Sequence, residues 1–281
     1  MPLSANKIYA HEAGYASHNF KKSIMWGTLN VPGTILEKCA AVKEAGYQGI
    51  EPNSHMNRQE IIDAVKATGL EVSSVCCALH WSKPLSHPDP AIRQEGIEGV
   101  ILAMEDAKAY GTDAILLVPG IVNENSHYDD CWNRSIECIK KIVPVAENLK
   151  VNICIENVWN KFIMSPMEAI HYMDQCNSEY VKFYLDCGNL LMYGWPEQWI
   201  KILGNRLGRI HIKEFSREIA EVEGRRAGFR KPLTEGSVNW EKVMQAARQY
   251  YQNVWLTTEI DSGNTIETLK DLSARFDKIL T

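Results

Sequence analysis

The sequence predicts one α/β domain, a (β/α)8 or TIM barrel over residues 22–281, preceded by an N-terminal arm at residues 1–21. Short β-rich apolar runs alternate with helical segments eight times, which is the order of a parallel barrel. The chain has the length of such a barrel, and no Pro/Gly/Ser-rich linker divides it. A doubly wound sheet is disfavoured, because the turn at 27–30 has no Gly-rich phosphate-binding pattern.

Glycines mark the helix ends in the first half of the chain. Gly46, Gly69 and Gly111 each follow a run with apolar residues three and four positions apart, and Pro90 stands in the first turn of the third helix. The elements predicted here are strand 23–26, helix 34–45, strand 47–51, helix 58–68, strand 71–79 reaching His80 and Trp81, helix 89–110, strand 114–118 and helix 129–148.

The same alternation continues in the second half. Ser165 is a predicted N-cap with Pro166 at the first helical position. The polar stretch 213–238 is predicted to be a long loop over the site, because loops of this length in a compact domain are usually functional. The remaining elements are strands 151–155, 181–185, 209–212 and 254–258 and helices 165–174, 196–203, 239–250 and 265–280.

Composition excludes several classes of protein. The net charge is −5 without a basic block, so a nucleic-acid partner is not expected. No apolar run reaches the roughly 18 residues of a transmembrane helix, and no signal-peptide pattern opens the chain. The eight cysteines form no CxxC pair, which is typical of buried thiols in a reducing compartment. We expect a cytoplasmic protein without a membrane partner. A trimmed leader to the periplasm and a homo-oligomer, dimer or tetramer, are left open.

Four candidate metal ligands lie at or near the ends of the last four predicted strands: Glu156, Asp186, His211 and Glu259. Strand ends meet at one face of a barrel, and strand alternation points all four inward. Three carboxylates and an imidazole suit one divalent ion, Mn²⁺ first, with Mg²⁺, Co²⁺ or Zn²⁺ as alternatives. A structural zinc site is not expected without cysteine. The alternative is that each residue caps a strand or pairs with a lysine.

These strand ends carry the motifs IEN, LDCGN, HIKE and TTEI, in that order. With AGYQGIEP near the second strand and EGSVNW before the seventh helix, the chain resembles the sugar isomerase/epimerase family over roughly residues 22 to 280. This family has the xylose isomerase-like TIM barrel and includes D-tagatose 3-epimerase, hydroxypyruvate isomerase and inosose dehydratase. The resemblance implies a divalent metal on the four ligands, with Glu156 and Glu259 as acid/base groups on either side of the substrate carbon.

The resemblance also bears on substrate contacts. Arg217, six residues after His211, matches an arginine that contacts substrate in the ketose 3-epimerases. Two positions depart from that subgroup, since Phe162 stands where it has a glutamate and Asn189 where it has a histidine. Both positions help to bind substrate hydroxyls there, so a tagatose or psicose substrate is not implied.

The predicted activity is that of a divalent-metal-dependent sugar isomerase or epimerase acting on a ketose, keto-sugar or sugar phosphate. The metal stabilises an enediolate while one carboxylate removes a proton and another returns it. Loss of a leaving group would instead make the protein a lyase or dehydratase of a keto-sugar or keto-glycoside. A non-catalytic sugar-binding barrel is a more distant alternative.

Further substrate contacts are predicted from positions at or near strand ends for Lys213, His80, Glu51 and Trp159, and the resemblance implies two more positions, Arg217 and Asn189. Lys213 shares the inward face with His211 and could neutralise an oxyanion, or it could instead pair with Glu214 or Glu235. His80 could be a structural histidine, and Trp159 could belong to the core. Glu51 could orient a sugar hydroxyl or support a metal ligand.

Overall fold

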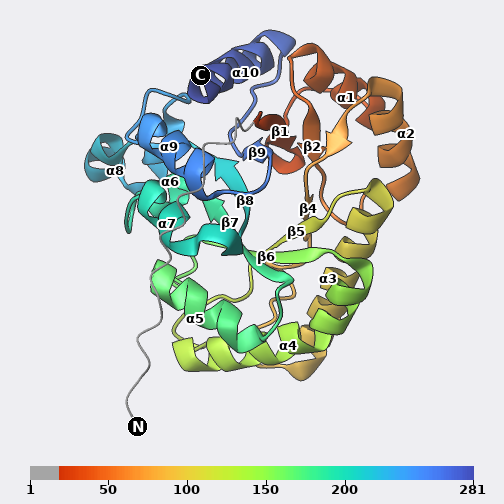
Figure 1. The fold of residues 1–281 in the computed structure, drawn as a ribbon, viewed down its shortest axis with the longest axis vertical. Coiled ribbons are helices and arrows are strands. Elements are labelled where there is room, and N and C mark those ends of the chain that lie inside the picture. Colours follow the sequence, from red (N-terminus) through yellow and green to blue (C-terminus); the bar gives the residue numbers. More distant parts are fainter. Residues whose placement is uncertain (1–18) are drawn as a thin grey trace.

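The computed structural model describes residues 19–281, which form a parallel β-barrel inside a ring of helices (Figure 1). The strands are hydrogen-bonded in the order β3-β2-β1-β9-β8-β7-β6-β5-β4. They are β1 (Lys21–Met25), β2 (Gly49–Glu51), β3 (Glu71–Val72), β4 (Val75–Cys76), β5 (Ala114–Leu117), β6 (Asn152–Glu156), β7 (Val181–Asp186), β8 (Leu207–Ile212) and β9 (Trp255–Thr258). The predicted barrel is confirmed.

The helices pack outside the barrel. Many begin at a polar N-cap, such as Thr34 and Ser165, each in a reciprocal capping box, and Gly69 and Gly111 end two of them with positive φ. They are α1 (Ile35–Glu44), α2 (Arg58–Thr68), α3 (Pro90–Tyr110), α4 (Tyr128–Leu149), α5 (Pro166–Cys176), α6 (Cys187–Leu190), α7 (Pro196–Leu203), α8 (Arg217–Glu223), α9 (Trp240–Tyr250) and α10 (Ile266–Leu280). Short 3₁₀ turns are η1 (Trp26–Thr28), η2 (Gly204–Arg206) and η3 (Arg225–Arg230).

The third predicted strand is wrong in its length. It is divided into β3 and β4, because β3 pairs with β2 whereas β4 pairs with β5. At the division, the Ser73 carbonyl accepts side-chain hydrogen bonds from Thr112 Oγ1 and Arg209 Nε. Backbone bonds such as Cys76 N to Pro52 O, at 2.9 Å, join β4 to the end of β2 and complete the ring.

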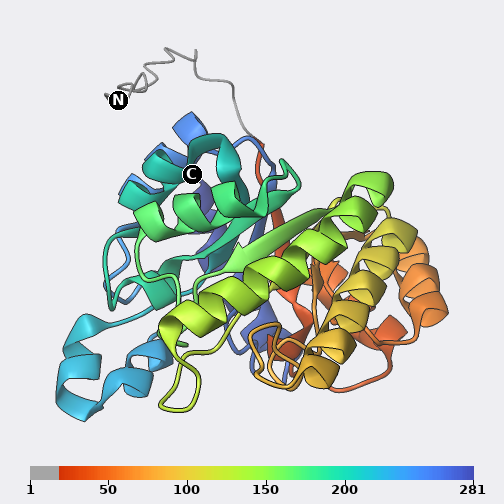
Figure 2. The same cartoon turned by 90° about the horizontal axis from the view of Figure 1, so that it is seen from below.

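The predicted loop at 213–238 is also corrected, since it contains α8 and η3. Figure 2 shows this segment projecting beyond the ring of helices. One carboxylate anchors it, because the buried Glu214 accepts four hydrogen bonds. The donors are Phe215 N, Val238 N, Thr234 N and Trp240 Nε1.

Inward and outward residues alternate as predicted. Ile210 and Ile212 belong to the large core between barrel and helices, whereas Cys154 and Tyr184 belong to a small separate cluster inside the barrel. All eight cysteines are buried and free. Among residues 19–281, no helix combines the length and the apolar character needed to cross a bilayer. The predicted N-terminal arm lies almost wholly outside the described residues.

Candidate metal centre

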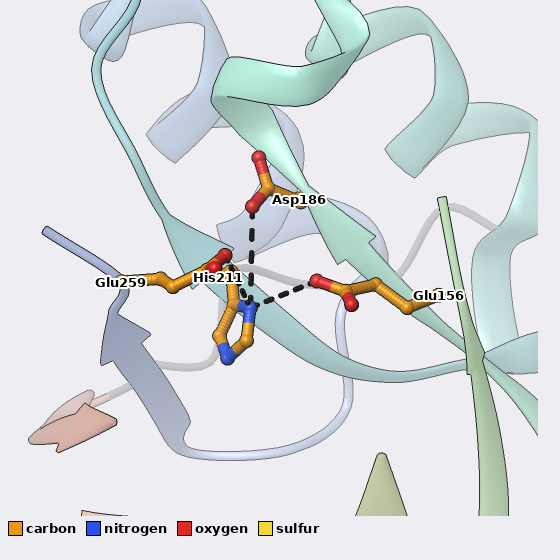
Figure 3. Close-up of side chains that lie close together, drawn as sticks. All are labelled: Glu156, Asp186, His211 and Glu259. Atoms are coloured by element: carbon orange, nitrogen blue, oxygen red, sulfur yellow. Dashed lines mark hydrogen bonds and ion pairs between the residues drawn. The ribbon is translucent and has the colours of Figure 1, made fainter. Parts of the chain in front are cut away.

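Four side chains from successive strands meet inside one end of the barrel (Figure 3). Glu156 ends β6, Asp186 ends β7, His211 lies in β8 and Glu259 follows β9 directly. Each offers one ligand atom, and these atoms all lie within 4.8 Å of one another. His211 Nδ1 lies 3.0 Å from Glu156 Oε1, 3.2 Å from Glu259 Oε2 and 4.0 Å from Asp186 Oδ2. The predicted convergence of these residues is therefore present.

Asn157 holds Asp186 in place. Its Oδ1 accepts from Asp186 N at 2.9 Å, and its Nδ2 donates to Asp186 O at 3.0 Å. One Asp186 oxygen, Oδ1, accepts from Asn189 N at 2.7 Å. The other, Oδ2, is directed toward the cluster. The asparagine of the IEN motif thus fixes the backbone from which the neighbouring strand presents its carboxylate.

Glu51 lies behind the imidazole of His211. It is fully buried, and its Oε2 lies 2.8 Å from His211 Nε2. Its Oε1 accepts from Ser74 Oγ at 2.5 Å and from Tyr184 OH at 2.8 Å. A proton on Nε2 donated to Glu51 leaves the Nδ1 lone pair for a metal ion. This contact with His211 favours the alternative that Glu51 supports a metal ligand, and its contact with a substrate hydroxyl stays a prediction.

Burial and charge act against each other in the cluster. Burial raises the pKa of Glu156 and that of Asp186, because charged carboxylates lose hydration. Burial also opposes ionisation of Glu259, yet Lys213 and then His211 outweigh it and hold the pKa of Glu259 below its usual range. Burial disfavours the charged imidazole, but Tyr184, Glu51 and the other carboxylates raise the pKa of His211. The positive charges of Lys213 and of protonated His211 therefore stabilise the ionised form of Glu259.

The donor set fits a divalent cation. Asp186 Oδ2 and Glu259 Oε2 are buried oxygens that, within residues 19–281, receive no well-directed hydrogen bond. Buried acceptors of this kind are costly unless positive charge stabilises them, and Lys213 Nζ, 3.0 Å from Glu259 Oε2 and 3.6 Å from Asp186 Oδ2, supplies part of that charge. Carboxylate oxygens with a single imidazole suit a hard or borderline dication such as Mn²⁺, Mg²⁺ or Co²⁺. The residues that would hold it are Glu156, Asp186, His211 and Glu259.

Lys213 reaches the same cluster. Its Nζ lies 3.0 Å from Glu259 Oε2 and 3.6 Å from Asp186 Oδ2. Within residues 19–281 the alternative pairing of Lys213 is not found, because Glu235 pairs with Arg275 and Glu214 accepts from the four donors named above. Lys213 is therefore the cationic side chain of the site.

Two further predicted contacts lie near the site but are held by the protein itself. Asn189 donates its Nδ2 to the Asn157 carbonyl at 3.0 Å, and Trp159 donates its Nε1 to the Asn189 carbonyl at 3.0 Å. The ring of Trp159 packs against Phe215 and Phe229. These contacts give both residues a structural role, and their contact with substrate stays a prediction.

His80 lies in a turn beyond β4, so its predicted place at a strand end is wrong. Its Nδ1 accepts from Val118 N at 3.3 Å, and burial lowers the pKa of His80 to about 4, so the ring is neutral at pH 7. The charge of Glu259 acts on the pKa of His80 in the opposite direction but does not outweigh burial, and contact of His80 with substrate stays a prediction.

Arg217 is not among the side chains gathered at the cluster. Its guanidinium donates to the carbonyls of Leu191 and Gly194, each at 3.0 Å, and lies over the ring of Trp195 at 5.1 Å. It thus joins α8 to the segment between α6 and α7. Its role in substrate binding stays a prediction.

Sequence reasoning missed Phe229. Its ring centroid lies 4.9 Å from Lys213 Nζ and 4.8 Å from the ring of Trp159, so η3 forms part of the wall of the site. The available signal was compositional, since Phe215 and Phe229 are the two aromatic residues of the polar segment 213–238. Phe162, at the position of a glutamate in the 3-epimerases, is buried in an aromatic cluster away from the ligands.

Comparison with known proteins identifies the family. The family model of the xylose isomerase-like TIM barrel matches residues 39–278. The chain belongs to this family. Among curated relatives, the L-ribulose-5-phosphate 3-epimerase UlaE of Escherichia coli K12 is 24% identical over 266 residues, covering 86% of this chain and 90% of the relative. The enzyme of the same name from Salmonella heidelberg is 23% identical over 258 residues, covering 84% and 87%.

Several solved structures share the fold. L-ribulose 3-epimerase has a TM-score of 0.78 at 16% identity, covering 93% of this chain and 94% of the other. The 3-keto-D-glucoside 4-epimerase YcjR of Escherichia coli also has a TM-score of 0.78 at 16% identity, with 92% and 98% covered. D-psicose 3-epimerase of Clostridium cellulolyticum H10 has a TM-score of 0.76 at 18% identity, with 92% and 98% covered. The predicted family and the prediction of an isomerase-class enzyme are confirmed.

Proposed function

We propose that this member of the xylose isomerase-like TIM barrel family is a divalent-metal-dependent epimerase or isomerase of a ketose, keto-sugar or sugar phosphate. The observation that carries the proposal is the convergence of Glu156, Asp186, His211 and Glu259, with two buried carboxylate oxygens that receive no well-directed hydrogen bond within residues 19–281. The names of the curated relatives, which are epimerases of a ketose phosphate, support the reaction class. Mn²⁺ is the favoured ion, with Mg²⁺, Co²⁺ or Zn²⁺ as alternatives.

The two glutamates supply the proton transfers. A dication held by Glu156, Asp186, His211 and Glu259 would supply Lewis-acid polarisation of the substrate carbonyl. Glu156 and Glu259 come from β6 and from the end of β9, on two sides of His211 (Figure 3). One carboxylate takes the proton from the carbon beside the ketone, and the other returns a proton. Return to the opposite face of the same carbon gives the epimer, and return to the adjacent carbon gives the isomer.

Lys213 adds a second positive charge to this arrangement. Its Nζ, 3.0 Å from Glu259, lies within reach of an oxyanion that forms beside that carboxylate. We assign it the stabilisation of negative charge on a substrate oxygen. Asn157 and Glu51 position the ligands, as described above.

Metal removal and replacement test this function. After dialysis against a chelator, the protein should lose proton exchange at C3 of a ketose panel, and stoichiometric Mn²⁺ should restore it. Product analysis by mass spectrometry separates the lyase alternative, because elimination removes water or an aglycone whereas epimerisation leaves the mass unchanged. Full activity of the chelated, metal-free protein would refute metal dependence.

A further inference from the structure

A trough of about 930 Å³ opens beside the metal centre. Lys213 and Glu259 line its inner end, and it runs between η3 and the start of α10 as far as Asp271 and Arg275. This volume is at the upper end of the roughly 300–1,000 Å³ range of pockets that enclose drug-sized ligands. A single monosaccharide is smaller than such ligands, so one sugar at the metal centre leaves most of the trough unfilled.

We propose that the trough is a subsite for a second sugar unit, so that the substrate is a ketose or keto-sugar joined to another sugar through a glycosidic bond. The inference rests on the proposed function for the position of the reacting carbon, and it adds the substrate class. In this arrangement the ketose lies at the inner end, next to Lys213 and Glu259. The attached sugar extends outward along η3 and α10.

The lining has the chemistry of a carbohydrate site. Apolar side chains, including Phe229, Pro232 and Leu272, form part of the trough and offer surface to the C–H faces of a sugar ring. Three exposed carboxylates line it as well, Asp261, Glu267 and Asp271, the last of which pairs with Arg275. Ionised carboxylates only accept hydrogen bonds, and sugar hydroxyls donate them.

The charges of the lining disfavour a phosphate in this position. Phosphate recognition uses arginines that are free to make paired hydrogen bonds. Here Arg230 forms an ion pair with Glu223, and Arg275 forms one with Glu235 at 2.5 Å. Outside the metal centre, Lys231 is the remaining cation of the trough lining. A neutral polyhydroxyl group therefore fits better than an anion.

Calorimetric binding to the full chain tests the proposal with three compounds that differ only at O6 of fructose. These are fructose itself, fructose 6-phosphate and isomaltulose, which carries a glucosyl group there. We expect isomaltulose to bind at least roughly tenfold more tightly than the other two. Tightest binding of fructose 6-phosphate, equal binding of all three, or no binding of isomaltulose at millimolar concentration would overturn the proposal.

Two matched variants show whether the difference arises in the trough. Glu267→Trp places a bulky side chain in the trough from the first turn of α10, and Glu241→Trp places the same side chain on the exposed first turn of α9, outside it. We expect Glu267→Trp to abolish the preference for isomaltulose and Glu241→Trp to retain it. An unchanged preference in Glu267→Trp would overturn the inference. If the unmodified protein binds isomaltulose but catalyses no proton exchange on any ketose, the proposed function is refuted instead.

Discussion

Glu51 Oε2 lies 2.8 Å from His211 Nε2, on the side of the imidazole opposite to Nδ1 and the three carboxylates of the metal centre. Glu51 itself is fixed by hydrogen bonds from Ser74 and Tyr184. A metal-binding histidine is commonly oriented by a carboxylate on its other nitrogen. This contact leaves Nδ1 as the nitrogen of His211 that would face a bound cation.

The first prediction concerns this contact. Glu51→Gln should weaken Mn²⁺ binding by about 10–100-fold, the usual effect of losing such a partner, while the protein remains folded. Calorimetric titration of the apoprotein with Mn²⁺ measures it, and Glu241→Gln on the exposed surface of α9 is the control. Unchanged affinity in Glu51→Gln would show that the packing of β8 alone orients His211.

The second prediction concerns Lys213, which is 3.0 Å from Glu259. Lys213→Met should tighten Mn²⁺ binding, because Nζ and the cation compete for the same carboxylate oxygens. It should also lower kcat, because the oxyanion loses a charge, by the roughly 10²–10³-fold typical of losing such a group. Calorimetry and ketose turnover measure the two effects. Weaker metal binding together with unchanged kcat would contradict both roles of Lys213.

The third prediction concerns Glu214. Glu214→Ala leaves four hydrogen-bond donors without their shared acceptor, and each buried unsatisfied group costs about 1–3 kcal/mol. The free energy of unfolding in urea should fall by about 3 kcal/mol or more, and segment 213–238 should become sensitive to protease. Glu218→Ala, on α8, is the matched control. Equal stability of the two variants would show that Glu214 does not anchor the segment.

The fourth prediction concerns pH. The pKa of buried His80 is about 4 in the fold, below its ordinary value of 6.5, so the unfolded chain binds the additional proton between these pH values. The free energy of unfolding should therefore fall as pH falls from about 6.5 to 4. The contribution of His80 to this loss should be about 3 kcal/mol, at about 1.36 kcal/mol for each unit by which its pKa is lowered. Urea unfolding of His80→Asn should show a smaller loss over this range. The prediction is contradicted if the free energy of unfolding of His80→Asn depends on pH as strongly as that of the parent protein and of the exposed control His127→Asn.

The strand ends and the convergence of four candidate metal ligands were predictable because they follow from local pattern. Alternation placed Asp186 and His211 inward from apolar neighbours, and their parallel strands share one exit face. The break between β3 and β4 was not predictable, because Ser73 and Ser74 lie in an uninterrupted buried run and only the change of partner strand divides it.

Contacts between segments that are distant in sequence also could not be predicted. The sequence left Lys213 two kinds of partner, and the choice depends on where the chain places Glu259 and Glu235 in space. Phe229 lies in the wall of the site because Glu214 anchors segment 213–238. No periodic pattern in the sequence predicts this anchoring. Sequence therefore predicted the chemistry of the centre better than its surroundings.

The division of labour between Glu156 and Glu259 is the central claim, and deuterium exchange in D₂O tests it most directly. Glu156→Gln and Glu259→Gln keep an oxygen for the metal and remove one base each, so both should bind Mn²⁺ and lose turnover by roughly 10²–10⁴-fold. The variant that retains the base on the substrate's face should still wash deuterium into the substrate, and the other should exchange only from the product side. Equal washout in both variants at the wild-type rate would contradict the account, because a third group would then be the base.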